Sequence, residues 1–383
     1  MVKKILVLGG GIGGIAVANI LADKLKESAD ITLIDRKKYF QFPPSYPWLM
    51  IGKRKPEQVQ KELTILSKKG INVINEDIIS IDTSGKKVRT ETSEYSGDYM
   101  VISLGAQYNI AAIPGFSDYA HHIYDLDSAI AFRDLVKNFK HGTIAIGISR
   151  LPFKCPAAPY ETAFLLDDYF TKEGVRAEIN IEFFTPEPLP VPSVGPDVGN
   201  RVLELLRSRN INYHPKLKLA EITDKELIFD NQETLNYDLL FAVPPHEAPK
   251  PVADAGLTDV TGWIPANGKN METKIPGVYA IGDVASIQTP HGYVPYLSKA
   301  GVFAHAQAEV VANNIANLVL GKSQAKEWDG EGGCFMETSI GEGTFMKGEF
   351  YAQPKPRIDY HEPGKVWHMQ KVVFEKYWMR HWF

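Results

Sequence analysis

A glycine-rich turn near the N-terminus limits the fold more than any other part of the sequence. Residues 4–8 predict a strand, and an apolar helix is predicted after the glycines, ending at Leu25. Between them Gly9, Gly11 and Gly14 fit the pattern G-x-G-x-x-G, which permits a tight turn and close approach of the backbone to a pyrophosphate. A second strand over residues 30–34 ends in Asp35, at the spacing from Gly14 where a carboxylate can accept ribose hydroxyls. The segment therefore predicts a dinucleotide-binding unit.

A second unit of the same kind lacks the glycines. Residues 143–148 predict a buried strand and residues 159–169 the helix that follows it. The joint over residues 149–156 contains no Gly-x-Gly and instead carries Cys155. One nucleotide site is thus predicted to be retained, and the other to be replaced by sulfur chemistry.

Composition excludes several classes of protein. A chain of 383 residues suits two intertwined domains and a tail, and a net charge of −4 argues against a general nucleic-acid binder. No run approaches the roughly 18–20 apolar residues of a membrane-spanning helix. Two cysteines supply no disulfide framework for a secreted fold, so we expect a cytoplasmic protein. His121 and His122 lack partners at ligand spacing, so no metal site is predicted.

A distant motif distinguishes FAD from NAD. Residues 274–286, KIPGVYAIGDVAS, predict a short strand that ends in Gly282 and Asp283. Together with the N-terminal turn, this motif resembles the flavoproteins with two dinucleotide-binding domains, and residues 98–105 resemble their crossover strand. The resemblance implies that Asp283 binds the ribityl chain of FAD; a helix cap or turn is the alternative. It implies FAD-binding roles for a further set of residues: Gly9, Gly11, Gly14, Asp35, Arg36, Ser45, Ile78, Gly105, Gly282 and Lys299.

Three segments narrow the resemblance. Residues 40–48 (FQFPPSYPW), 153–161 (FKCPAAPYE) and 332–335 (GGCF) are similar to sulfide:quinone oxidoreductases, and in part to the flavoprotein subunit of flavocytochrome c sulfide dehydrogenase. The resemblance implies that Cys155 and Cys334 form the redox pair that oxidises sulfide to persulfide or polysulfide sulfur, with electrons passing through FAD to a membrane quinone. It also implies that Glu161 handles protons and that Lys299 lies beside the flavin. A first-turn helix acid and a solvated surface lysine are the respective alternatives.

The chain departs from the family pattern at one point. Many members have a third cysteine in the segment that corresponds to residues 122–129, where this chain has Tyr124 or a neighbour. Covalent attachment of FAD by that route is excluded, so the FAD is predicted to be non-covalent.

Local chemistry favours reactive thiols. Cys155 precedes a helix and follows Lys154, and both features would lower a thiol pKa. Cys334 follows Gly332 and Gly333, which would let the backbone approach a flat cofactor and swing as sulfur is added. The alternative is two inert buried cysteines.

The C-terminal segment predicts membrane contact. On a helix over residues 365–383, Trp367, Phe374 and Trp378 fall within about 40° of one another, with Trp382 nearby. Four Lys/Arg and one Glu give the segment a charge of +3, which suits a helix lying among lipid headgroups. Lys371 falls on the aromatic side and weakens this interpretation unless its ammonium extends outward. Packing against the protein itself or against a dimer partner is the alternative.

These interpretations give an α/β fold with two Rossmann-like dinucleotide-binding domains and a membrane-associating tail. Residues 1–106 and 261–320 would form the FAD-binding domain, 107–260 the degenerate second domain, and 321–383 the tail. We expect a peripheral enzyme on the inner face of the cell membrane, and leave homo-oligomerisation open. Three alternatives stay open: a sulfide dehydrogenase with a cytochrome acceptor, an NADH:quinone dehydrogenase, and a non-catalytic FAD-binding redox sensor.

Overall fold

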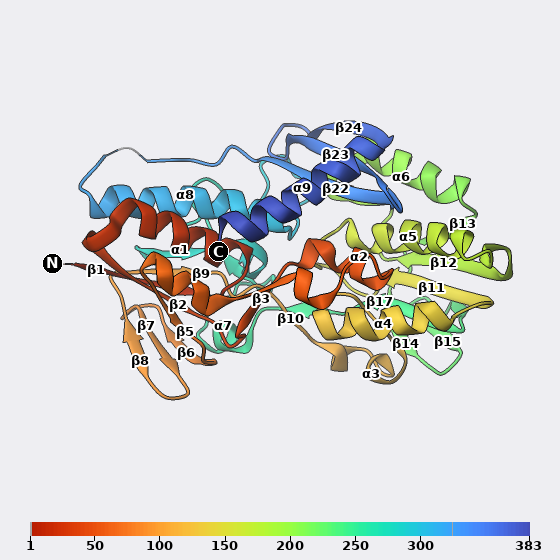
Figure 1. Ribbon diagram of the computed structural model, residues 1–383, viewed down its shortest axis with the longest axis horizontal. Coiled ribbons are helices and arrows are strands. Elements are labelled where there is room, and N and C mark those ends of the chain that lie inside the picture. The colour runs from red at the N-terminus through yellow and green to blue at the C-terminus, as the bar shows by residue number, and fades with distance from the viewer. Residues whose placement is uncertain (1, 324) are drawn as a thin grey trace.

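A computed structural model describes residues 2–323 and 325–383 as two α/β lobes joined along one side by the C-terminal segment (Figure 1). The first lobe is built on a parallel sheet of five strands in the order β20-β9-β1-β2-β5. Its strands are β1 (Lys3–Leu8), β2 (Ala29–Ile34), β5 (Ile71–Ile74), β9 (Tyr99–Ile102) and β20 (Val278–Ala280). Helices α1 (Ile12–Leu25) and α8 (Gly301–Val319) pack against each other in this lobe. The sheet therefore combines the start of the chain with a strand from much later in the sequence.

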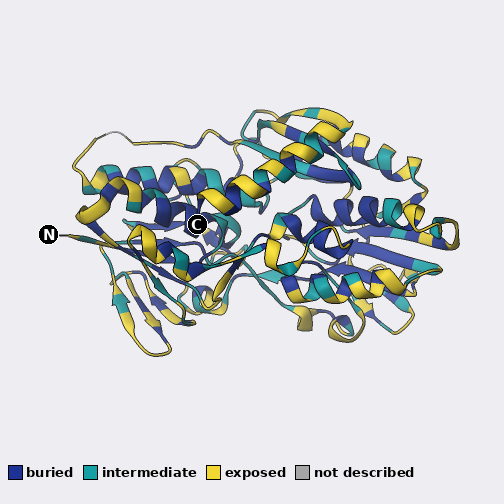
Figure 2. Ribbon diagram, viewed as in Figure 1, coloured by how far each residue is buried: buried dark blue, intermediate teal, exposed yellow. Residues whose placement is uncertain are grey.

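The second lobe is built on a parallel sheet of four strands in the order β13-β12-β11-β17. These are β11 (Gly142–Ile148), β12 (Ile179–Thr185), β13 (Ile211–Pro215) and β17 (Leu239–Val243), accompanied by α4 (Leu126–Asn138), α5 (Ala158–Lys172) and α6 (Pro196–Ser208). Residues 144–148 of β11 are all buried, as expected for a strand covered on both faces (Figure 2). The two segments that cross between the lobes pair as β10 (Gln107–Tyr108) and β18 (His246–Glu247).

Smaller elements complete both lobes. The first lobe carries the antiparallel sheet β6 (Ile78–Asp82), β7 (Lys87–Thr90), β8 (Glu94–Ser96) and the pair β3 (Tyr39–Gln41), β4 (Gln60–Glu62). The second lobe carries the antiparallel sheet β14 (Leu219–Ile222), β15 (Glu226–Phe229), β16 (Thr234–Asn236). Short elements are α2 (Tyr46–Met50), α3 (Phe116–Tyr119), α7 (Lys250–Asp254), β19 (Ile264–Pro265) and β21 (Ala285–Ser286).

The tail contains a sheet that the sequence analysis missed. Strands β22 (Glu331–Ser339), β23 (Glu342–Glu349) and β24 (Arg357–Gly364) form an antiparallel sheet, and α9 (Lys365–His381) follows directly. In Figure 1 this sheet covers the second lobe, and α9 runs diagonally from it to the first lobe. Over the described residues, no helix combines the length and the apolar character needed to cross a membrane.

The aromatic side of α9 faces the protein and not a membrane. Trp378 is 1% exposed and stacks on Phe40, with ring centroids 4.7 Å apart. Phe374 contacts the ring of Phe42, and Trp367 stacks on Phe345. The prediction that this stripe enters the lipid is therefore wrong, because the first lobe and the tail sheet supply aromatic partners that the sequence could not reveal. A second face of α9 is exposed: Val366, Met369, Val373 and Tyr377.

Candidate active site

A cavity of about 1030 Å³ connects the two lobes. Its walls include the glycine turn after β1, the segment after β9, the segment after β20, and the joint between β11 and α5. Of the residues predicted to bind cofactor, those that line it are Gly11, Asp35, Arg36, Ile78, Gly105, Gly282, Asp283 and Lys299. Most of the predicted site residues thus meet at one cavity, which is large enough for a dinucleotide cofactor.

The nucleotide end of the cavity requires glycine at the expected positions. A Cβ atom on Gly9, whose φ is +102°, would lie 2.3 Å from the Ser103 carbonyl oxygen. A Cβ atom on Gly14 would lie 1.8 Å from the Gly9 carbonyl oxygen. Both glycines therefore shape the turn from behind, whereas a Cβ on Gly11 would meet open space on the cavity side. The Asp35 carboxylate, at the end of β2, accepts hydrogen bonds from the backbone N–H groups of Gly10 (2.6 Å) and Lys37 (2.7 Å).

Ser45 does not fit the predicted cofactor role. It is fully buried, and its hydroxyl donates a 2.5 Å hydrogen bond to Glu375 Oε1 on α9. The neighbouring Pro44 and Tyr46 line the cavity instead. The side chain of Ser45 therefore helps to hold the tail helix against the first lobe.

Lys299 is buried at the cavity wall and is not a solvated surface lysine. It is 6% exposed, and its ammonium donates to the carbonyl oxygens of Asp283 (2.7 Å) and Ala285 (3.1 Å). The Nζ atom also lies 3.5 Å from the ring centroid of Trp263. Burial lowers the pKa of Lys299 to about 8, although the Asp283 carboxylate opposes the shift. Burial also raises the pKa of Asp283, and Lys154 and Lys299 oppose that change.

The fold brings the two cysteines to one place. Cys155 lies in the joint between β11 and α5 with a φ of +57°, and its N–H donates a 2.7 Å hydrogen bond to the Lys299 carbonyl oxygen. Cys334 lies on β22, opposite Met346 of β23, and β22 packs against α5. Both thiols are free and partly buried, and a charge on Cys334 is close enough to raise the pKa of Cys155. Only Cys155 of the two is among the described residues that line the cavity.

The expectation of acidic thiols is wrong. Burial raises the pKa of Cys155, and burial also raises the pKa of Cys334 to about 12. Lys371, from α9, is the cation that lowers the pKa of both thiols. Lys154 also interacts with a charge on Cys155, and its ammonium lies 5.0 Å from the ring centroid of Tyr108. Removal of the sulfur atoms from water outweighs the local helix and lysine effects on which the sequence argument depended.

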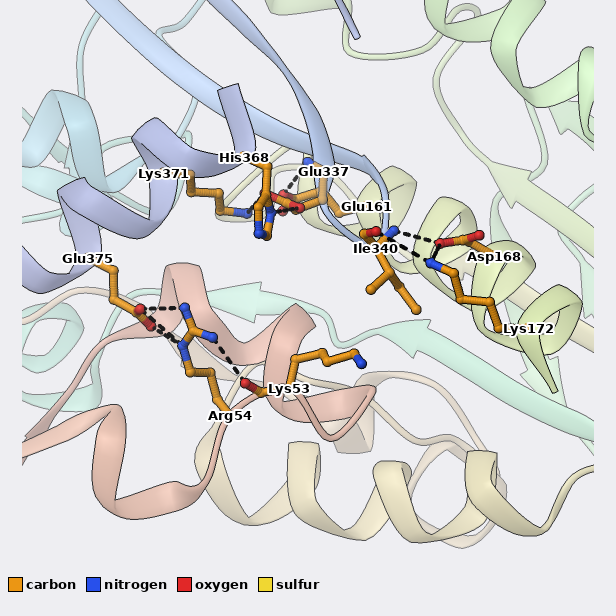
Figure 3. A network of polar contacts seen from close by, with 10 residues as sticks. All are labelled: Lys53, Arg54, Glu161, Asp168, Lys172, Glu337, Ile340, His368, Lys371 and Glu375. Atoms are coloured by element: carbon orange, nitrogen blue, oxygen red, sulfur yellow. Dashed lines mark hydrogen bonds and ion pairs between the residues drawn. The ribbon is translucent and has the colours of Figure 1, made fainter. Parts of the chain in front are cut away.

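A buried network of charges lies beside the thiols (Figure 3). Glu161, in the first turn of α5, accepts hydrogen bonds from the Lys371 ammonium (2.5 Å) and the Glu337 backbone N–H (2.7 Å). The Glu337 carboxylate of β22 lies 3.8 Å from Lys371 Nζ through Oε1, and its Oε2 lies 2.8 Å from His368 Nδ1. Burial raises the pKa of Glu161 despite Lys371. Burial opposes the charge of Lys371, but the two carboxylates outweigh it and raise the pKa of Lys371.

Gly332 and Gly333 do not form a hinge. Both lie within β22, where a Cβ on Gly332 would be 2.6 Å from the Phe303 ring and one on Gly333 would be 2.7 Å from the Phe345 ring. These glycines allow aromatic rings to pack onto the strand beside Cys334. The expectation that they let the backbone swing is wrong, because the strand is paired with β23 along this stretch.

The second lobe has its nucleotide-binding positions filled by its own side chains. The first turn of α5, which would face a pyrophosphate, carries the Glu161 carboxylate and is covered by β22. Just beyond the end of β12, where an acid would meet a ribose, Glu187 is buried and accepts a 2.9 Å hydrogen bond from the Tyr160 hydroxyl. Burial raises the pKa of Glu187 to about 7.

Sequence reasoning missed Lys371, Glu337 and His368 as parts of the site. The available signal was Lys371 itself, a lysine within a stripe of aromatic residues that turn out to be buried. Among the described residues, no group of three or more His, Cys, Asp or Glu side chains is arranged to hold a metal ion.

Fold and site together define the class of flavoprotein with two α/β lobes, each built on a parallel sheet, and a large cavity lined by residues of both. A family model described as pyridine nucleotide-disulphide oxidoreductase matches residues 3–309, and the chain belongs to this family. Its cofactor is FAD, which the glycine turn and the cavity fit.

Several of the proteins that this chain is similar to are sulfide:quinone oxidoreductases. The chain is 27% identical to the sulfide-quinone reductase of Aquifex aeolicus over 405 residues, covering 99% of this chain and 91% of that protein. It is 26% identical to the mitochondrial sulfide:quinone oxidoreductase of Dictyostelium discoideum, covering 88% and 76%. The crystal structure of the Aquifex aeolicus enzyme matches with a TM-score of 0.89 and 26% identity, covering 98% of this chain and 90% of that one. The predicted resemblance to sulfide:quinone oxidoreductases, and the prediction of an FAD-dependent oxidoreductase of that type, are confirmed.

Proposed function

We propose that this chain oxidises sulfide to persulfide or polysulfide sulfur at a Cys155–Cys334 pair, with electrons passing through FAD to a membrane quinone. The observation that carries the proposal is that two cysteines far apart in the sequence lie close enough to affect each other's charge, and that one of them, Cys155, lines a cavity that fits FAD. Bound FAD would accept two electrons from the sulfur site and deliver them to the quinone.

The sulfur chemistry requires the pair in its disulfide form. A hydrosulfide ion attacks one sulfur, a new S–S bond forms as a persulfide on that cysteine, and the other cysteine leaves as a thiolate. Sulfide is oxidised and the disulfide is reduced in this step. The thiolate and the persulfide would then lose two electrons and one proton and rejoin as a bridge that is one sulfur atom longer, and the disulfide returns when the added sulfur leaves as product.

The buried charges suit this exchange. Lys371 is the cation that stabilises either thiolate, and Glu161 lies close enough to affect the pKa of both sulfurs. Because burial raises the pKa of Glu161, its carboxyl can take up the proton that hydrosulfide brings. Lys299, at the cavity wall, would place its positive charge beside the cofactor.

An NADH:quinone dehydrogenase is disfavoured by the second lobe. The joint after β11 holds no glycine turn, and Glu161 and Glu187 both have partners within the protein. A pyrophosphate at this point would meet a carboxylate and the covering strand β22.

The test is anaerobic absorbance of the purified holoenzyme, with sulfide or NADH added separately and a soluble quinone added afterwards. Bleaching of the flavin by sulfide and recovery with quinone would support the proposal. Bleaching by NADH alone would identify an NADH dehydrogenase. An absorbance change without turnover would favour the non-catalytic redox sensor. Turnover of sulfide only with a cytochrome as acceptor would favour the sulfide dehydrogenase.

We propose that the exposed face of α9 contacts the inner face of the cell membrane. Val366, Met369, Val373 and Tyr377 are between 54% and 60% exposed and project within an arc of about 80°. Exposed basic residues lie on or beside this arc: Lys365, Lys376 and Arg380. An apolar stripe with basic residues along one edge matches an anionic lipid surface, which it would enter without spanning the bilayer.

Charged substitutions on this face should release the protein from lipid. The double variant Met369→Glu/Val373→Glu is expected to bind anionic vesicles about 10- to 100-fold more weakly, because two apolar side chains are lost from the contact. Vesicle co-sedimentation measures the change, and sulfide-dependent bleaching should be unaffected. Val260→Glu, at a side chain 102% exposed on another segment, is the control and should bind like the unmodified protein. Equal binding by all three would exclude this face.

A further inference from the structure

Trp48 ends the segment of residues 40–48 that resembles sulfide:quinone oxidoreductases, and the proposed function gives it no role. It belongs to the short helix α2 of the first lobe and is 2% exposed. Tyr46 and Pro47, on the same helix, line the cavity, and α2 packs against α4 and α5 of the second lobe. The indole is therefore buried at a place where the two lobes meet.

Two cations lie over the indole ring of Trp48. Arg54 Cζ is 4.3 Å and Lys371 Nζ is 4.8 Å from the ring centroid, and the ring of His368 makes an edge contact with a centroid distance of 5.6 Å. A cation within about 6 Å of the face of an aromatic ring is attracted by the electrons of that ring, and tryptophan gives the strongest attraction. The indole is therefore placed to hold the ammonium of Lys371.

The Lys371 ammonium has few hydrogen-bond acceptors. Lys371 is 4% exposed, and its ammonium carries three N–H groups. Glu161 accepts one hydrogen bond at 2.5 Å, whereas Glu337 Oε1 lies 3.8 Å away, beyond hydrogen-bond distance. Among the described residues, Lys371 donates no other hydrogen bond. The face of an aromatic ring can take up part of this deficit.

The indole N–H of Trp48 does not explain why a tryptophan stands here. It is buried and has no hydrogen-bond partner among the described residues. A buried donor without a partner costs stability, and phenylalanine or leucine at this position would avoid that cost. The attraction of the indole face for cations offsets the cost, and a smaller side chain would supply less of that attraction.

We propose that Trp48 is a positioning residue, whose indole face holds the Lys371 ammonium against Glu161 beside the sulfur site. Glu161 lies in the first turn of α5, just after Cys155, so the ammonium that it binds stays near that sulfur. Trp48 is not among the described residues that line the cavity, so it would act on Cys155 only through Lys371. The consequence for sulfide oxidation rests on the proposed function, but the effect on the thiol does not.

The experiment measures how fast Cys155 reacts when the indole is changed. The chain has two cysteines, so Cys334→Ser leaves Cys155 as the single thiol of the parent protein. The rate of alkylation by iodoacetamide is followed against pH for the parent holoenzyme and after adding Trp48→Phe, Trp48→Leu, Lys371→Met, or the last two together. Phenylalanine retains a weaker ring, and leucine retains none. The other charged groups that act on the thiol stay the same in every protein: Lys154 and Glu161.

We expect Trp48→Leu to slow alkylation at pH 8 about three- to tenfold and to move the profile to higher pH, because a displaced cation no longer favours the thiolate. Trp48→Phe should lie between Trp48→Leu and the parent. In the Lys371→Met background, Trp48→Leu should add no further slowing, since the cation through which it acts is gone. A merely structural effect would loosen the site and expose the thiol, so it would speed alkylation.

Trp328→Leu is the matched control, because Trp328 is a buried indole that contacts other aromatic rings and has no cation over it among the described residues. It should leave the profile unchanged. Unchanged or faster alkylation in Trp48→Leu would overturn the inference, and so would equal slowing by Trp328→Leu or further slowing in the Lys371→Met background. Should Lys371→Met give no folded holoenzyme, the Trp48 series decides alone, and a Trp48→Phe variant as slow as Trp48→Leu would overturn the inference.

Alkylation needs no sulfide, so the two proposals fail separately. Slowed alkylation in Trp48→Leu, combined with a two-cysteine enzyme that sulfide does not bleach, would retain the positioning role and refute the proposed function. Normal bleaching of the two-cysteine enzyme by sulfide, combined with an unchanged alkylation profile in Trp48→Leu, would retain the proposed function and refute the positioning role.

Discussion

Replacing either Cys155 or Cys334 by serine is expected to slow sulfide-dependent bleaching of bound FAD by at least ~10³-fold. With one cysteine left, the enzyme has no disulfide for hydrosulfide to attack, and a serine hydroxyl cannot replace the missing sulfur. Both thiols lie around the same buried pair, Glu161 and Lys371, so loss of either should have a similar effect. Anaerobic stopped-flow absorbance measures the rate.

The controls separate chemistry from folding. Both serine variants should retain FAD and should still bleach on photoreduction. Met346→Leu changes the residue opposite Cys334 on β23 while conserving volume, and should stay within about threefold of the unmodified rate. Normal bleaching by sulfide in either serine variant would show that electrons enter the flavin without the cysteine pair.

Lys371→Met is expected to lower the free energy of unfolding by about 3–5 kcal/mol, as removal of one partner from a buried ion pair does. The substitution leaves Glu161 and Glu337 buried without their shared cation. The pKa of Glu161, already raised by burial, would rise further, so the folded protein would hold a proton that the unfolded chain releases. Stability of the variant should therefore fall as pH rises, and its deficit should be larger at pH 8 than at pH 5.5. Urea denaturation followed by circular dichroism measures both values.

A lysine on the outer side of the same helix provides the comparison. Lys376 is exposed, so Lys376→Met should change the free energy of unfolding by less than about 0.5 kcal/mol. Adding Glu161→Gln to Lys371→Met should recover part of the lost stability, because an amide does not need the cation. A deficit that is small and independent of pH would mean that Lys371 does not hold the carboxylates in their charged forms.

The cofactor-binding part of the site could be predicted because its sequence signals are local. The glycines after β1, Asp35 after β2, and Gly282 with Asp283 after β20 are all tied to the ends of short buried strands. In a parallel sheet these ends meet at one edge, so spacing along the sequence translates into position in space.

The other half depends on burial and on long-range contacts. Nothing near Cys155 in the sequence shows that burial outweighs Lys154 and the helix, so the predicted direction of the thiol pKa was wrong. The three strands β22, β23 and β24 were missed because two glycines and a cysteine suggest flexibility until Phe303 and Phe345 are seen to pack on them. The aromatic stripe of α9 was assigned to lipid because its partners, Phe40 and Phe42, lie near the opposite end of the sequence.

Two charged side chains a turn apart on helix α9 reach one lobe each, in addition to the aromatic contacts that the helix makes with the first lobe. Lys371 meets Glu161 of the second lobe, and Glu375 meets Arg54 of the first at 2.7 Å (Figure 3). A shortened chain that stops before Lys365 would therefore not be a more soluble form of the same enzyme. We expect loss of the helix to leave Glu161 and Glu337 without their shared cation and to remove one of the connections between the lobes. Attempts to simplify this protein for crystallisation or biosensing should replace the exposed apolar side chains of the helix, such as Met369 and Val373, and keep its backbone intact.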